Sequence, residues 1–381
     1  MKTYLKYLLP AFLILVGGEN HTFAGTPLSP WSEGCLDIHA INSGRGECTF
    51  FIFPDGTSMV VDAGGISALN PKYPKVPPKP DSLSSPSTVY ARYIRHFLPR
   101  KAKCKLDYAI VTHYHIDHFS AIAELCEEIP FRTLADRSWP DYSDERYVAK
   151  SNMDFYTSFV KRFPACVRKK MLRFEPGRND QIVLRHKPRG YPNFRVKNYA
   201  AGGIVWDGEK CIDPYEGKQV KENGASCCFL LSYGDFDYYT GGDAGGNSKV
   251  ALPVARAIGR QIDAMKADHH LSHHTMEQEQ MDILQPSIVV TQSFFVRDIQ
   301  PDLPTMRRLL SDYPDMKFFF TNIAEEMQKA AQDVFSKAYG MNGHIVIRVL
   351  PGGTEYMVYV LDDNDYQYNI KSEFGPFRSK P

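Results

Sequence analysis

The feature that most constrains this chain is a cluster of histidines that follows an apolar segment. Leu106–Thr112 has the composition of a buried strand, and the motif Thr-His-Tyr-His-Ile-Asp-His occupies positions 112–118. Apolar residues at helical spacing then predict a helix over Phe119–Ile129. Side chains at such a strand-to-helix junction lie at the carboxyl edge of a sheet, where the sites of α/β proteins form.

This motif has the chemistry of a metal site. It supplies three imidazoles and one carboxylate within six residues, and zinc binds such nitrogen and oxygen donors at about 2 Å. Four donors this close in sequence are less crowded when two ions share them. His113 and His115 can face one ion, while Asp117 and His118 face the second. A surface run of histidines, or histidines that cap a helix, is the alternative, which the buried strand before the motif disfavours.

His-x-His-x-Asp-His after a strand is identified as the motif of the metallo-β-lactamase fold, and three further elements of that family are present. Asp-Ala-Gly at 62–64 resembles its early Asp-x-Gly, in which the Asp supports a ligand without binding metal. Thr-Gly-Gly-Asp at 240–243 resembles the Gly-Asp that supplies a metal-bridging carboxylate. Lys-Ala-Asp-His-His at 266–270 resembles the Lys-x-x-His-His that supplies the last ligand. The resemblance covers roughly residues 35–350.

The resemblance implies an α/β protein that folds as an αββα sandwich, with two mixed β-sheets and helices on their outer faces. The order of strands and helices along the chain favours the same architecture over a doubly wound parallel sheet. The middle of the chain is less regular, with helices expected around 144–163 and strands at 181–185 and 194–200. We expect one hydrolase domain over residues 25–381.

The resemblance also implies a set of ligands for two divalent ions, with zinc foremost and manganese or iron as alternatives. The expected ligands are His113, His115, Asp117, His118, Asp243 and His269. Asp62 is expected to support a ligand, and Asp117 and His270 to be catalytic, with His270 donating a proton to the leaving group. Whether His269 or His270 is the ligand stays open. Many enzymes of this fold carry a further histidine before the bridging Asp, and His186 is the one available in that interval.

A subgroup of the family is indicated by two shorter elements. Gly-Arg-Gly-Glu at 44–47, with Pro-Asp-Gly at 54–56, resembles the start of the hydrolase domain of ComEC-type competence proteins. Asn-Gly-Ala-Ser at 223–226 is also similar to that group. Two positions depart from it, because such domains commonly carry Asp where His115 stands and follow their His-His pair with Gly-Ser. No membrane-channel segments are found, so DNA transport is not implied.

Two metals at this site imply hydrolysis. A water between two divalent ions has its pKa lowered enough to be hydroxide near neutral pH, and the ions polarise a carbonyl or phosphoryl oxygen. We expect hydrolysis of a phosphoester or phosphodiester, in a small molecule or in an anionic polymer such as nucleic acid. One alternative is a carboxylic ester, lactone or amide hydrolase with the same metal core. The other is an envelope protein that binds its ligand without turnover.

A basic segment favours the anionic substrate. Residues 161–197 contain 12 Lys or Arg and two acids, although the whole chain has 45 basic and 44 acidic residues. The overall balance excludes a polycationic nucleic-acid coat, whereas a local patch concentrates anions. Arg168, Lys169 and Lys170 are therefore expected to bind substrate. A solvated face is the alternative interpretation of this segment.

The first 24 residues are typical of a signal peptide. Lys2 and Lys6 precede the apolar stretch Tyr7–Val16, and Thr-Phe-Ala at 22–24 offers small residues for cleavage after Ala24. The apolar stretch is about half of the ~20 residues that a membrane helix needs, so a short anchor is the less favoured alternative. We expect export to the periplasm or the exterior. The eight cysteines show no zinc-finger spacing, and export would permit disulfides.

Overall fold

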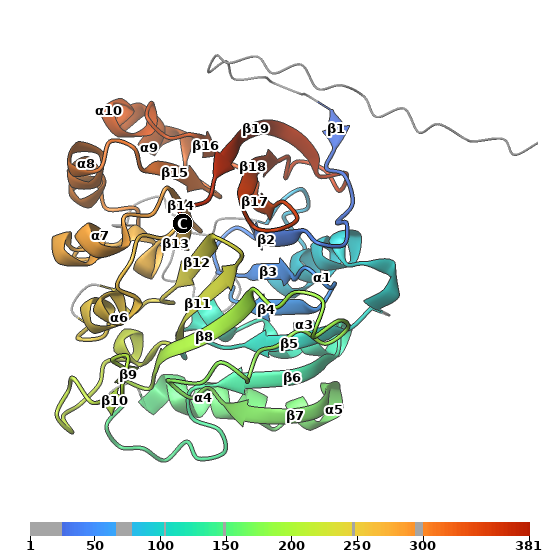
Figure 1. The fold of residues 1–381 in the computed structure, drawn as a ribbon. Coiled ribbons are helices and arrows are strands. Elements are labelled where there is room, and N and C mark those ends of the chain that lie inside the picture. Colours follow the sequence, from blue (N-terminus) through green and yellow to red (C-terminus); the bar gives the residue numbers. More distant parts are fainter. Residues whose placement is uncertain (1–24, 66–77, 103, 148–149, 246–247, 294–299) are drawn as a thin grey trace, which may run out of the picture.

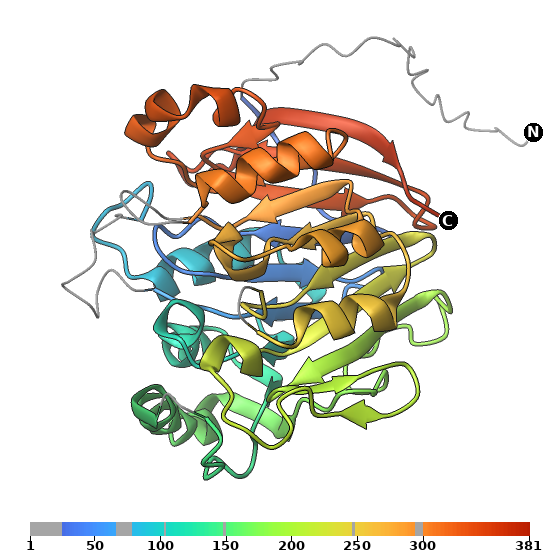
Figure 2. The ribbon, with the colours of Figure 1, turned by 90° about the vertical axis from the view of Figure 1, so that its left-hand side faces the viewer.

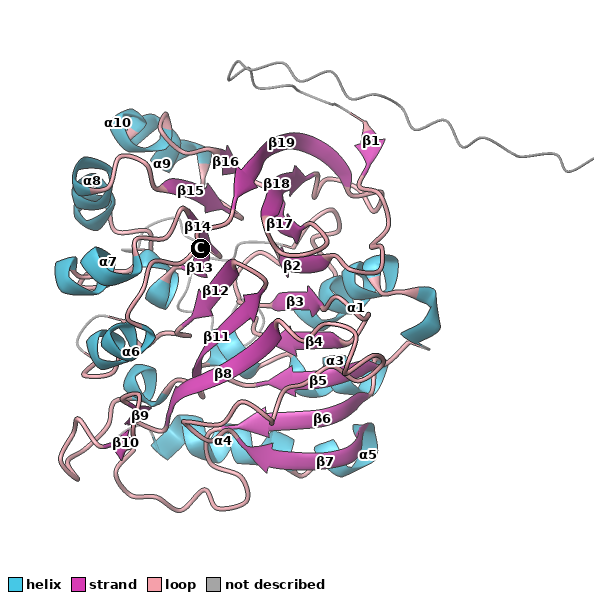
Figure 3. Cartoon of the chain, in the orientation of Figure 1, coloured by secondary structure: helices cyan, strands magenta, loops and turns pink. Residues whose placement is uncertain are grey.

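The structure is a computed structural model that describes residues 25–65, 78–102, 104–147, 150–245, 248–293 and 300–381 (Figure 1). The expected signal peptide, residues 1–24, lies outside this range. Two mixed sheets face each other between two layers of helices (Figures 1 and 3). The predicted αββα sandwich of the metallo-β-lactamase fold is therefore confirmed.

The first sheet is antiparallel on one side and parallel from β4 to β7. Its described strands, in spatial order, are β1 (Thr26–Pro27), β19 (Asn369–Arg378), β18 (Glu355–Leu361), β17 (His344–Val349), β2 (Leu36–Ala40), β3 (Thr49–Ile52), β4 (Ser58–Val61), β5 (Leu106–Ile110), β6 (Phe131–Asp136) and β7 (Val167–Arg173).

The second sheet is parallel from β12 to β16. Its described strands, in spatial order, are β10 (Cys211–Ile212), β9 (Ile204–Trp206), β8 (Phe194–Ala201), β11 (Cys228–Tyr233), β12 (Phe236–Thr240), β13 (Ala264–Lys266), β14 (Ile288–Thr291), β15 (Lys317–Phe320) and β16 (Gly340–Met341).

Alternation along the strands builds the layers, because successive side chains of a strand point to opposite faces. Phe50 and Ile52 pack against the first helix layer, whereas Phe51 and Phe53 pack between the sheets. The first layer contains α1 (Pro86–Phe97), α2 (Ile116–Phe119), α3 (Ile122–Glu128), α4 (Lys150–Val160) and α5 (Phe163–Cys166). The second layer contains α6 (Ala251–Ile258), α7 (Gln278–Leu284), α8 (Leu303–Asp312), α9 (Glu325–Ala330) and α10 (Gln332–Phe335) (Figure 2).

Two of the elements expected from the sequence differ in the structure. Residues 181–185 form no strand, although Ile182 and Leu184 are buried between the sheets. Their backbone bonds to side chains instead, since Val183 N bonds to the Tyr108 hydroxyl at 3.2 Å. The expected helix 119–129 is shortened to α3, because Ala121 N donates to Ala63 O at 2.9 Å instead of to a helical carbonyl, so that α2 ends at Phe119 and α3 begins at Ile122.

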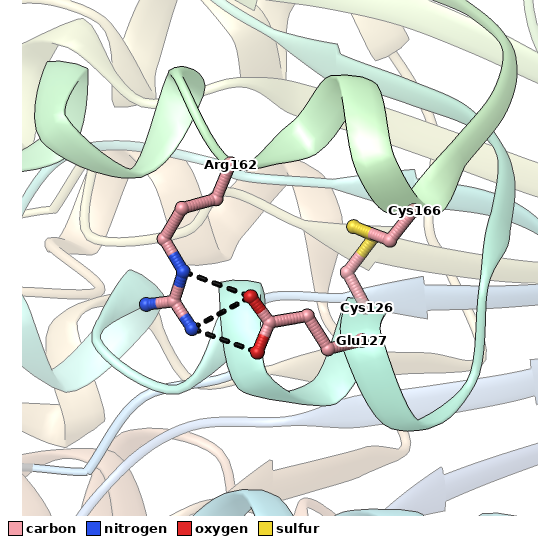
Figure 4. Close-up of a disulfide and its surroundings, with 4 residues drawn as sticks. All are labelled: Cys126, Glu127, Arg162 and Cys166. Atoms are coloured by element: carbon pink, nitrogen blue, oxygen red, sulfur yellow. Dashed lines mark hydrogen bonds and ion pairs between the residues drawn. A yellow bond between two sulfur atoms is a disulfide. The ribbon is translucent and has the colours of Figure 1, made fainter.

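One disulfide joins the helices on the outer face of the first sheet. Cys126 of α3 bonds to Cys166 of α5, with a Cα–Cα distance of 5.6 Å (Figure 4). Arg162 lies beside this bond and forms ion pairs with Glu124 and Glu127 of α3. Covalent and ionic contacts therefore hold the same two helices together. Within the described ranges, no helix has both the length and the apolar character needed to span a bilayer.

Candidate metal centre

The loops that leave the parallel strands of both sheets meet at one edge of the sandwich. Asp62 follows β4 and His113 follows β5 in the first sheet, while Asp243 follows β12 and His270 follows β13 in the second. Carboxyl ends of parallel strands are the usual position of a site in α/β folds. The two sheets therefore contribute ligand atoms from opposite sides of one space.

The first group of ligand atoms contains His113, His115 and Asp243. His113 Nε2 lies 3.1 Å from His115 Nδ1 and 3.6 Å from Asp243 Oδ2. The hydroxyl of Thr112 donates to Asp62 at 2.7 Å and lies 3.1 Å from His113 Nδ1. Because its single proton is engaged, this hydroxyl accepts from Nδ1–H, which leaves the lone pair of His113 Nε2 directed into the group.

The second group of ligand atoms is built around His118 and His270. Their Nε2 atoms are 3.2 Å apart, and they lie 3.2 and 3.6 Å from Asp243 Oδ2 respectively. Asp117 Oδ2 lies 3.4 Å from His270 Nε2 and 4.0 Å from His118 Nε2. Asp243 Oδ2 is thus common to both groups.

The hydrogen bonds behind these imidazoles test whether the groups fit a metal. His118 Nδ1 donates to Asp62 Oδ2 at 2.8 Å, and His270 Nδ1 donates to the carbonyl oxygen of Gln292 at 3.0 Å. When both rings are neutral, each therefore turns an Nε2 lone pair toward the other. Two facing lone pairs beside a carboxylate repel each other, and a shared cation removes that repulsion. The residues fit a metal ion at this point.

Asp62 supports both groups. Its Oδ2 accepts hydrogen bonds from the Thr112 hydroxyl and from His118 Nδ1, while Oδ1 accepts from Thr112 N at 2.7 Å. The residue is fully buried and has a left-handed backbone, with φ of 59°. One carboxylate therefore orients His118 directly and His113 through Thr112.

A buried ion pair that the sequence-based assignment missed lies beside the centre. Lys266 Nζ donates to Gly242 O at 2.6 Å and lies 3.0 Å from Glu47 Oε2 and 3.2 Å from Asp243 Oδ1. Burial opposes the charge of Lys266, but the carboxylates of Glu47 and Asp243 outweigh it and raise its pKa. Glu47 Oε2 also lies 3.6 Å from His270 Nδ1. The Gly-Arg-Gly-Glu element at 44–47 was the available sequence signal for Glu47.

The two adjacent histidines of the second cluster point to different places. His269, His270 and Leu271 have φ of 49°, 53° and 61°, three consecutive left-handed residues. This backbone directs the fully buried His270 into the second group. His269 Nε2 lies 3.2 Å from Asn223 Nδ2 and 3.9 Å from Asp243 Oδ2, and its side chain is 25% exposed. Burial lowers the pKa of His269 to about 4.

Two further sets of expected site residues lie away from the centre. His186 Nε2 lies 3.4 Å from Asp107 Oδ2 at the start of β5, whereas His113 follows the end of that strand. Arg168, Lys169 and Lys170 are exposed in the first half of β7, the described edge strand. Arg173, rather than these three, occupies the end of β7 nearest the loops of the centre. Cations on an edge strand discourage pairing with other chains.

The comparison with known families agrees with the fold and covers the first histidine motif. Residues 45–186 match the family described as the metallo-beta-lactamase superfamily. The chain therefore contains a metallo-beta-lactamase superfamily domain, and members of that superfamily are metal-dependent hydrolases. The comparison with curated proteins gives no match.

Several solved structures are similar to this chain at low sequence identity. One is CmlA, a diiron beta-hydroxylase from Streptomyces venezuelae, with 11% identity, a TM-score of 0.42, and coverage of 84% of this chain and 55% of that one. Another is Zn(2+)-bound PqqB from Methylobacterium extorquens, with 11% identity, a TM-score of 0.39, and coverage of 82% and 99%. A diphosphatase of the PhnP family has 9% identity, a TM-score of 0.38, and coverage of 82% and 96%. This chain thus spans little more than half the length of CmlA.

Proposed function

We propose that this protein is a phosphoester hydrolase, with phosphodiesters included, that uses two divalent ions, zinc foremost. The sharing of Asp243 Oδ2 between the two groups of ligand atoms carries this proposal. The oxygen lies 3.6 Å from His113 Nε2 and 3.2 Å from His118 Nε2. A carboxylate between two sets of imidazoles is suited to bridge a pair of ions.

The charge of the centre favours an anionic substrate. When bound, two divalent ions lower the pKa of a water between them and polarise a phosphoryl oxygen. In this proposal Asp117 and Asp243 are the anionic ligands and the histidine ligands are neutral. Glu47 also lies among the ligand atoms of the second group, and its charge is balanced by Lys266. The charge of two divalent ions would still exceed that of these two ligands and of the buried Asp62 behind them. This excess attracts a phosphate ester more strongly than a neutral ester.

The side chains around the centre take distinct roles in this proposal. Ser226 Oγ accepts from Asp243 N at 3.1 Å, and Lys266 contacts Asp243 Oδ1, so the bridging carboxylate is held from two sides. His270 acts as a ligand because its Nε2 is directed at His118. His269, partly exposed and held by Asn223, faces the approaching substrate in the position first expected for His270.

We further propose the ComEC-type hydrolase subgroup. The sequence elements that resemble this group meet at the bridging carboxylate. Ser226 of the Asn-Gly-Ala-Ser element bonds to Asp243, and Asn223 of the same element contacts His269. Lys266, which contacts Asp243, also lies 3.0 Å from Glu47 of the Gly-Arg-Gly-Glu element. Because these elements meet at one site, their resemblance to the ComEC-type group supports the assignment to this subgroup.

Export is also proposed, with residues 1–24 as a cleaved signal peptide and residues 25–381 as the mature domain. The Cys126–Cys166 disulfide supports it, because such bonds persist in oxidising compartments outside the cytosol. Mass spectrometry of the native N-terminus should find Gly25 or a neighbour. An intact Met1 in a cytoplasmic fraction would contradict the proposal.

The activity test compares substrate classes at fixed metal loading. Protein purified without added metal is loaded with zinc or manganese and offered bis-p-nitrophenyl phosphate, p-nitrophenyl phosphate, p-nitrophenyl acetate and a lactone. We expect phosphodiester hydrolysis that chelation removes and metal restores. Asp243→Ala should abolish it, whereas the exposed His273 gives a matched control in His273→Ala.

Two outcomes would contradict this proposal. Hydrolysis confined to the acetate and the lactone would favour the carboxylic ester, lactone or amide alternative. A fully loaded protein that binds phosphodiesters without hydrolysing any of the four substrates would favour the envelope binding protein.

A further inference from the structure

A second cavity lies at the end of β4 and β5 opposite the metal centre. Its volume is about 670 Å³, within the range of small-molecule sites. The Asp55–Gly56 turn, which precedes β4, lines one side, and His186, which contacts Asp107 at the start of β5, lines another. The length of the strands therefore separates this cavity from the ligands of the proposed ions.

One wall of the cavity is apolar. Leu28, Trp31, Phe97 and Leu98 line it, and all except Trp31 are less than 10% exposed. Trp31 Nε1 donates to Cys35 O at 2.7 Å. Because this N–H is already bonded, the indole offers the cavity an apolar ring surface. The wall suits a hydrocarbon or aromatic body.

The opposite wall is polar and held in place by the β3–β4 turn. Asp55 Oδ2 accepts hydrogen bonds from His186 N at 2.8 Å and Lys187 N at 2.9 Å. Arg185 N donates to Thr57 Oγ1 at 2.7 Å. The backbone amides of residues 185–187 thus hold this loop in place. Ligand binding therefore costs little conformational entropy in the loop.

Among the described residues that line the cavity, the ion pairs leave the guanidinium of Arg100 available. Glu33 and Lys187 form an ion pair with each other, and the Asp55 carboxylate is bonded by backbone amides. Arg100 lines the cavity, is exposed, and makes no hydrogen bond or ion pair with any residue in the described ranges. A guanidinium in this position binds a carboxylate, sulfonate or phosphate group in two-pronged geometry.

We propose that this cavity binds an amphiphilic anion, with an apolar body against Trp31 and Phe97 and a single acidic group at Arg100. The site is separate from the metal centre, so occupancy leaves the approach to the proposed ions open. Binding at this cavity requires only its lining residues and is independent of the hydrolase reaction.

Calorimetric titration of the full chain with decanoate, decanol and acetate tests the proposal. We expect one-to-one binding of decanoate, at least about tenfold tighter than decanol, because a charge-assisted hydrogen bond contributes that much. Acetate should not bind measurably, since it lacks the apolar body. Saturable binding of none of the three, or equal affinities for decanoate and decanol, would overturn the proposal.

Variants locate the two parts of the ligand. Arg100→Gln should remove the preference for decanoate over decanol, while Arg378→Gln, at an exposed arginine outside the cavity, should keep it. Ala102→Phe fills the cavity and should weaken both ligands at least tenfold, with an unchanged melting temperature as the check on folding. A preference that survives Arg100→Gln would overturn the assignment, as would full decanoate affinity in a folded Ala102→Phe protein.

Discussion

Asp62 lies behind the ligand cluster, and three hydrogen bonds end on its carboxylate. Through them it sets the orientation of His118 and, by way of the Thr112 hydroxyl, that of His113. Asp62 thus orients the ligands while its own carboxylate oxygens accept hydrogen bonds. At the scale of single residues, the geometry of the centre depends on acceptors of this kind as much as on the ligands.

Asp62→Asn should therefore weaken metal binding without removing a ligand. One amide oxygen cannot replace both carboxylate oxygens, so the amide nitrogen would face a donor, either Thr112 N or His118 Nδ1. We expect zinc affinity to fall about 10- to 100-fold, as measured by competition with a chelator. Asp107→Asn, at the other end of β5, should leave it unchanged. Equal affinities for Asp62→Asn and the parent would disprove the supporting role.

The assignment of the two histidines gives a second test at this scale. Asp243→Ala should lower metal content most, because its carboxylate belongs to both groups, and His270→Ala should also lower it. His269→Ala should keep nearly the full content while losing activity. Metal content is measured by inductively coupled plasma mass spectrometry. If His269→Ala lowers the metal content more than His270→Ala does, His269 is the ligand instead.

Sequence reasoning reaches the first histidine motif because its spacing and preceding strand constrain the local backbone. It does not separate His269 from His270, because three consecutive left-handed residues reverse the direction that neighbouring side chains would normally take. Glu47 and Lys266 meet across the two sheets, and no local pattern reports such a pairing. Contacts between residues that are far apart in the sequence can be read only from the folded structure.

At the scale of elements, apolar periodicity predicts most strands and helices that have a core face. It misses β7, because Arg168, Lys169 and Lys170 are interpreted as a substrate-binding patch, with a solvated face as the alternative, and not as part of a strand that pairs with β6. It adds a strand at 181–185, because Ile182 and Leu184 alternate and are buried without entering a sheet. Burial and sheet pairing are different constraints, and periodicity reports only the first.

The link between α3 and α5 allows a prediction about stability. Replacing Cys126 and Cys166 together by Ala opens a covalent loop with a sequence separation of 40 residues. We expect the free energy of unfolding to fall by about 3 to 4 kcal/mol, as measured by urea denaturation. Arg162→Gln, which removes the partly exposed ion pairs beside the disulfide, should cost less than about 1 kcal/mol. Equal losses for the two changes would contradict this ranking.

At the scale of the whole molecule, buried histidines make stability depend on pH. His344 is buried at the start of β17, and its Nδ1 accepts a hydrogen bond from Asn42 N at 3.0 Å. Burial lowers the pKa of His344 to about 4, whereas an unfolded chain keeps about 6.5. Between these values the unfolded chain holds a proton that the native protein lacks, so stability falls as pH decreases from 6.5 toward 4.

The loss assigned to His344 is about 3 kcal/mol at pH 4. His344→Asn keeps an acceptor near the position of Nδ1 but cannot titrate, so its unfolding free energy should depend less on pH. Urea denaturation at pH 7.5 and pH 4.5, with chelator present to exclude metal release, measures the difference. Parallel pH profiles for the variant and the parent would show that another group causes the acid sensitivity.

If both groups bind an ion, as proposed, the sharing of Asp243 Oδ2 means that the two positions cannot fill as independent equilibria. An ion at His113 and His115 would fix the carboxylate that its neighbour needs, and would also repel the neighbour's charge. Whichever of these two effects dominates, each ion alters the affinity for the other by the same factor. The protein with one ion bound is then a distinct species with its own population. The concentration of free metal determines how much of the protein holds no ion, one ion or two ions.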